Sequence, residues 1–81
     1  MGSAFHRYAD FSDERRATVH AMLTDPEFRS AKLSPGARLL YAVSGLMCDE
    51  TGTVKRADLD HAMADPSIVQ CARNLLREAG F

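Results

Sequence analysis

Apolar and polar residues recur with helical spacing along most of this chain. At about 100° per residue, the segment 66–79 separates completely into two sides. Its apolar side carries Ile68, Val69, Cys71, Ala72, Leu75, Leu76 and Ala79, and its polar side carries Gln70, Arg73, Asn74, Arg77 and Glu78. The segment 35–47 has a broader apolar face, made of Leu39, Leu40, Val43, Leu46 and Met47. This pattern predicts amphipathic helices that bury one side in a shared core.

The three prolines mark helix starts. Proline is well accommodated at the first helical position, and an Asp or Ser before it can accept hydrogen bonds from the free backbone amides. The pairs are Asp25 with Pro26, Ser34 with Pro35, and Asp65 with Pro66. Ser12, followed by two acidic residues, marks a fourth start, and Gly80 marks the end of the last helix. We predict helices over 12–23, 26–31, 35–47, 56–64 and 66–79.

These elements define an all-α fold, a compact bundle of about five short helices. Residues 12–81 are expected to form a single helical domain. Residues 1–11 show no periodicity and are expected to form a flexible N-terminal tail, which carries Phe5, Tyr8 and Phe11. Thr53 and Val54 are β-branched and could form a very short extended piece, but no sheet is expected. A chain of 81 residues can build one small core, with a stability of about 4–12 kcal/mol.

The charge is balanced, with ten basic and eleven acidic residues. Binding to a polyanion would therefore depend on local patches rather than on net charge. No apolar run approaches the ~20 residues that a bilayer-spanning helix needs, and the N-terminal region lacks the apolar stretch of a signal peptide. We therefore expect a cytoplasmic protein with no membrane contact. Arginine outnumbers lysine and alanine is abundant, which favours a GC-rich coding source, such as an actinobacterium or its phage.

The sequence offers no set of residues typical of catalysis or metal binding. Cys48 and Cys71 are not spaced with any histidine as zinc ligands are, and two thiols in a chain without a secretion signal are expected to stay reduced. Pairing Cys71 with His61, or Cys48 with His20, leaves both pairs without a glycine-rich oxyanion loop or an orienting carboxylate. We therefore expect no enzyme activity, no cofactor and no bound metal.

The segment 33–81 resembles a winged helix-turn-helix domain of the kind found in bacterial and phage regulators and replication initiators. The resemblance lies in the order of elements: a core helix after 33–36, a loop at 49–54, a short helix around 57–59 and a final helix that ends at Gly80. In this family the final helix is the recognition helix, which enters the major groove, and a β-hairpin wing follows it. The sequence stops at Phe81, where the wing would begin, so we expect a wingless version of the fold.

The resemblance implies a small DNA-binding protein with a role in transcription regulation or as an accessory factor. Gln and Asn can pair with adenine and Arg with guanine. Candidate contacts to double-stranded DNA are Ser67, Gln70, Arg73, Asn74 and Arg77, together with Lys55 and Arg56. Because one wingless module has little contact area, we expect it to act as a homodimer or beside another protein. Against this function, 49–65 contains five acidic and two basic residues.

An alternative is a protein-interaction module that binds and modulates a larger protein. Tyr41 projects from the side of its helix opposite the main apolar face, near Arg38 and Gly45. Either the first helix, through Val19 and Met22 among others, covers this side, or a partner helix fits a groove there. The candidate protein-binding residues are Arg38, Tyr41, Gly45 and Cys48.

Overall fold

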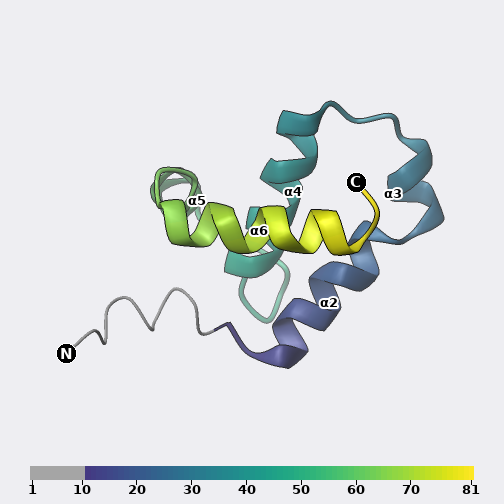
Figure 1. Cartoon of the computed structure of the whole chain (residues 1–81). Helices are drawn as coiled ribbons and strands as arrows, with labels where there is room; N and C mark the ends of the chain where they lie inside the picture. The colour runs from purple at the N-terminus through teal and green to yellow at the C-terminus, as the bar shows by residue number, and fades with distance from the viewer. Residues whose placement is uncertain (1–10) are drawn as a thin grey trace.

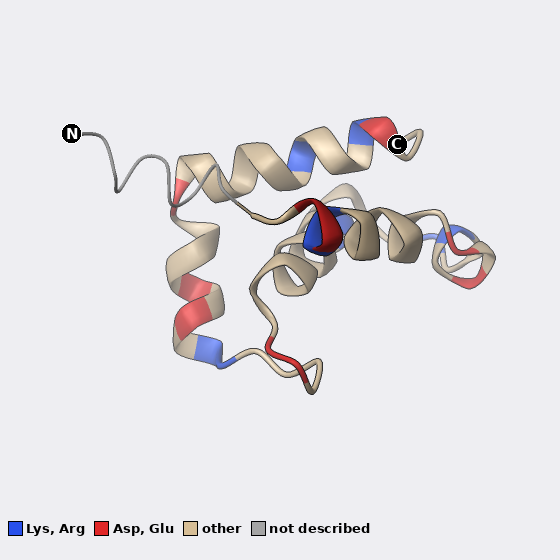
Figure 2. Cartoon of the chain, turned by 90° about the horizontal axis from the view of Figure 1, so that it is seen from below, with Lys and Arg blue, Asp and Glu red and all other residues tan. Residues whose placement is uncertain are grey.

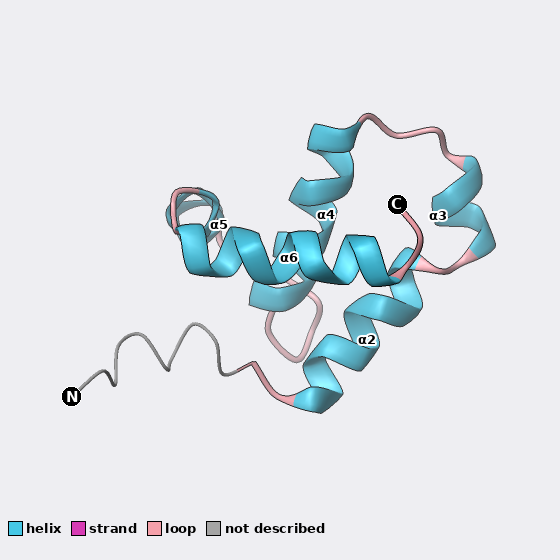
Figure 3. Cartoon of the chain, in the orientation of Figure 1, coloured by secondary structure: helices cyan, strands magenta, loops and turns pink. Residues whose placement is uncertain are grey.

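Five α-helices account for most of the residues that the computed structural model describes, residues 11–81, and none of these residues is in a strand (Figure 3). They are α2 (Asp13–Leu23), α3 (Pro26–Ser30), α4 (Pro35–Met47), α5 (Arg56–Met63) and α6 (Pro66–Glu78). The all-α prediction is confirmed, and every helix begins and ends within one residue of its predicted position. No helix in this part of the chain is long and apolar enough to cross a bilayer. The predicted tail residues Phe5 and Tyr8 lie outside the described residues, whereas Phe11 is half-buried and packs against the core.

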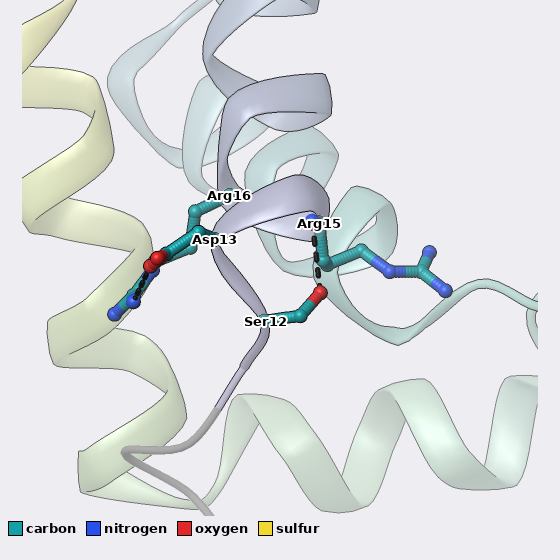
Figure 4. Close-up of polar contacts among 4 residues, drawn as sticks. All are labelled: Ser12, Asp13, Arg15 and Arg16. Carbon is teal, nitrogen blue, oxygen red and sulfur yellow. Dashed lines mark hydrogen bonds and ion pairs between the residues drawn. The ribbon is translucent and has the colours of Figure 1, made fainter.

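Side chains cap four of the five helices at the N-terminus, as the sequence predicts. The Ser12 hydroxyl accepts the backbone N–H of Arg15 at 3.0 Å (Figure 4), and the Ser34 hydroxyl caps α4 in the same way. Carboxylates of Asp25 and Asp65 cap α3 and α6. The exception is α5, which starts after Lys55 without a side-chain cap. A helix of eight residues is unstable alone, so α5 depends on packing against α4 and α6.

The core lies where α6 passes across α2, α4 and α5 (Figure 1). Its largest fully buried side chains are Val19 and Leu23 from α2 and Val43 from α4. From α6, Ile68, Ala72, Leu75 and the following Ala79 are buried at the spacing that the sequence predicts. No buried residue in the described region is polar or charged, so apolar burial is the main source of stability.

The predicted apolar face of α4 is wrong at one position. Leu40, assigned to the buried face, is 42% exposed, whereas Ala42, not assigned to it, is fully buried. The reason is the approach of α2. Its Val19 lies so close to Gly45 that a Cβ there would sit 3.0 Å from the valine methyl. Small residues allow this close contact, and α4 therefore turns Ala42 inward and Leu40 outward.

The end of α6 folds back toward α3, so that the C-terminus lies beside it (Figure 1). Gly80 has φ of 93°, a conformation that only glycine adopts readily. Its N–H bonds to the carbonyl of Arg77, and the N–H of Phe81 bonds to the carbonyl of Leu76 at 2.9 Å. These two bonds make a Schellman motif and confirm Gly80 as the helix end.

Candidate functional site

Two grooves flank α6, one on each side. The first lies between α6 and α4 and is about 380 Å³ in volume; the second lies between α6 and α2 and is about 670 Å³. Between them, the exposed side of α6 carries Gln70, Arg73, Asn74 and Arg77. The predicted recognition surface is therefore open to solvent along most of α6.

The groove between α4 and α6 is lined by three arginines, and we call it the arginine groove. Arg38 comes from α4, and Arg73 and Arg77 come from α6. None of the described side chains that line it is acidic. Its apolar wall is formed by Leu39, Leu76 and Phe81. Three positive charges from two helices therefore meet at one surface that suits an anion.

Arg38 is held in place by its neighbours. Its Nε donates a hydrogen bond to the carbonyl of Leu33 at 3.1 Å, and its guanidinium carbon lies 4.8 Å from the ring centroid of Phe81. The terminal nitrogens of Arg38 make no hydrogen bond within residues 11–81. The guanidiniums of Arg73 and Arg77 likewise have neither a hydrogen bond nor an ion pair among the described residues. All three arginines can therefore donate to a ligand.

An aromatic cluster adjoins the arginine groove. Phe28 of α3 makes edge contacts with Tyr41 and Phe81, with ring centroids 5.8 and 6.0 Å apart. Arg29 lies over the Phe81 ring at 4.5 Å and donates to the carbonyl of Ala79 at 2.6 Å. The sequence prediction assigned no role to Phe81 or Arg29. The available signal was the glycine before Phe81, because the residue after a Schellman glycine often packs back on its helix.

The second groove, between α6 and α2, contains titratable side chains. His20 and Cys71 both line it, and so does the ion pair of Asp13 with Arg16. Figure 4 shows that this pair turns to one side of α2 and Arg15 to the other. Burial raises the pKa of the Cys71 thiol; Arg16 opposes this shift, and the carboxylate of Glu78 adds to it. A thiol that stays protonated at neutral pH is a weak nucleophile.

The structure divides the predicted DNA-binding residues. Arg73 and Arg77 face the arginine groove, whereas Asn74 lines the groove beside α2 and accepts a hydrogen bond from Gln70 at 3.0 Å. Ser67 is half-buried in the first turn of α6. The basic residues Lys55 and Arg56 lie at the start of α5 and are not among the residues that line the arginine groove.

Two of the predicted protein-binding residues, Gly45 and Cys48, are half-buried and in contact with α2, and their part in binding a partner stays a prediction. Arg15 of α2 donates to the carbonyl of Gly45 at 3.2 Å and to the sulfur of Cys48 at 3.1 Å. The alternative that the first helix covers this side of α4 is confirmed at these positions. Tyr41 stays 49% exposed and contacts α3 rather than α2. Arg38 belongs to the arginine groove.

Searches for similar proteins do not assign a family. No protein-family model, no curated protein and no solved structure matches this chain. The resemblance to a winged helix-turn-helix domain therefore stays a prediction. Within residues 11–81, no three His, Cys, Asp or Glu side chains are grouped as metal ligands. Two surfaces of the described residues are candidates for binding, the arginine groove and the aromatic cluster.

Proposed function

We propose that this chain is a small non-enzymatic DNA-binding protein, of a regulatory or accessory kind, that contacts duplex DNA with the exposed side of α6. The observation that carries the proposal is the arginine groove. Arg38, Arg73 and Arg77 present guanidiniums on one surface, next to the amides of Gln70 and Asn74. The terminal nitrogens of all three have no hydrogen bond or ion pair within residues 11–81. Guanidiniums suit phosphates and guanine, and side-chain amides suit adenine.

The distribution of charge supports this proposal better than the net charge does. The chain as a whole carries −1, and several of its acidic residues lie in the loop after α4 and in α5 (Figure 2). The acidic residue of α6, Glu78, lines the groove beside α2, and no acidic side chain of the described residues lines the arginine groove. At physiological salt the Debye length is about 8 Å, so charges farther away are largely screened. A phosphate at the arginine groove would therefore interact mainly with the three guanidiniums.

An amide NMR titration with a short mixed-sequence duplex tests the proposal. At low salt we expect shifts along 67–77 and at Arg38, and we expect them to weaken at physiological salt because counterion release drives such binding. The double variant Arg73→Ala with Arg77→Ala should keep the wild-type fold and lose most of these shifts. A wild-type spectrum that the duplex leaves unchanged at low salt would refute DNA binding.

A second candidate function is protein binding, which the exposed apolar residues of α4 favour. Leu40 and Tyr41 are neighbours, both more than one-third exposed, and Tyr41 adjoins Phe28. Exposed aromatic residues are enriched at protein interfaces. In a pull-down, a genuine partner should be lost with a folded Tyr41→Ala variant and retained with Arg56→Ala, which changes a distant exposed residue. Equal retention by both variants would exclude this surface.

A further inference from the structure

The polar residues of α6 form two rows with different neighbours. Gln70 and Asn74 are four residues apart and share one row, with their amides bonded to each other. Arg73 and Arg77 share a second row, which is displaced by about 60° around the helix axis and faces α4. If the amide row contacts the edges of the bases, the arginine row points to one side of those contacts. In a duplex the sugar-phosphate backbone flanks the bases, so the arginine row would lie next to phosphates.

Arg38 adds a contact that α6 alone does not have. It lies across the groove from Arg73 and Arg77, and its hydrogen bond to Leu33 and its stacking on Phe81 fix its guanidinium. A side chain that is already ordered loses less conformational entropy when it binds. The sequence prediction placed Arg38 in a protein-binding set, whereas the groove places it with the two arginines of α6.

The apolar wall of the groove strengthens these contacts. Leu39, Leu76 and Phe81 line the same space as the guanidiniums, so a bound anion would exchange part of its water for apolar neighbours. Charge-assisted hydrogen bonds are stronger where water is partly excluded. The groove volume of about 380 Å³ falls in the range of ~300–1,000 Å³ that is typical of ligand sites.

We infer that the arginine groove binds a phosphate group of the DNA backbone, with Arg38, Arg73 and Arg77 as phosphate contacts rather than readers of base sequence. This inference rests on the proposed function and specifies the role of each arginine. It assigns Arg38 to the DNA surface and leaves base contacts to the amide row. Binding through the groove is then independent of sequence.

Binding measured by fluorescence anisotropy against salt tests this role. Each phosphate contact contributes about 0.9 to the slope of log K against log salt. We expect Arg38→Ala, Arg73→Ala and Arg77→Ala each to lower the slope by about that amount, and to weaken two duplexes of unrelated sequence equally. Lys32→Gln is the control, because it removes one positive charge from an exposed residue outside the groove lining, and it should leave slope and affinity unchanged. Amide spectra of each variant verify that it is folded.

Three results distinguish the inference from the proposed function. In the first, the wild type binds duplex but Arg38→Ala leaves the salt slope unchanged, or Arg73→Ala or Arg77→Ala changes the preference at one base pair alone. The inference about phosphate contacts is then wrong, and DNA binding stands. If the wild type binds no duplex but pyrophosphate shifts the arginine Nε–H signals of the groove, DNA binding is wrong and the groove binds free phosphate compounds. If neither ligand binds, both are wrong.

Discussion

Replacing Gly45 with alanine tests how α2 packs on α4. The new Cβ would lie 3.0 Å from a methyl of Val19 and 3.7 Å from the end of Met22. The methionine can move, but Val19 is 1% exposed and β-branched, so its side chain has no free rotamer to adopt. The two helices must separate slightly to accept the extra methyl group.

Two opposing terms determine the expected change in the free energy of unfolding. Alanine in place of glycine stabilises a helix interior by about 0.5–1 kcal/mol. Overpacking a buried contact costs about 1–3 kcal/mol. The net effect is a destabilisation of about 1 kcal/mol, which lowers Tm by roughly 4–8 °C in a domain of this size.

Gly36→Ala is the matched control, because it makes the same substitution in the same helix with no atom within 4 Å of the new Cβ. It should raise stability by about 0.4–1 kcal/mol. Urea denaturation and thermal melting followed by circular dichroism measure both variants. If Gly45→Ala is as stable as Gly36→Ala, the close contact of α2 with α4 is absent in solution, and Gly45 would again be open to a partner.

Three further predictions concern single side chains. Asp65→Ala should cost about 1 kcal/mol in urea denaturation, because the carboxylate accepts two amide N–H groups in the first turn of α6. Hydrogen bonds from the Thr51 hydroxyl and the Thr53 amide lower the pKa of Asp49. The Asp49 carboxylate therefore stabilises the fold fully above its unfolded pKa of about 3.9, and this stabilisation is lost as the pH falls through the lower folded pKa. The NMR chemical shift of the Thr53 amide should follow the titration of Asp49. The variant Asp49→Asn should abolish this pH dependence. Because burial raises the pKa of Cys71, iodoacetamide should alkylate it more slowly at pH 8 in the folded protein than in urea, and equal rates would contradict its burial.

Local chemistry explains why the helices could be predicted so closely. A cap such as Asp65 and a terminator such as Gly80 act on backbone groups within a few residues, so their effect is visible in the sequence. The buried side of α6 was equally predictable, because its apolar and polar residues separate completely at helical spacing. The exposure of Gln70 and Arg73 followed from the same pattern.

Only the tertiary structure decided which helix faces meet. The sequence could not show that α2 approaches at Gly45 and turns Leu40 outward, because several faces of α4 are apolar enough to be buried. It also could not place Arg38 opposite Arg77, since these residues are far apart in the chain and no periodic pattern links them. Helical period sets the direction of each side chain relative to its own axis. The packing of the core sets the rotation and crossing of the axes, and these bring the arginines to one groove.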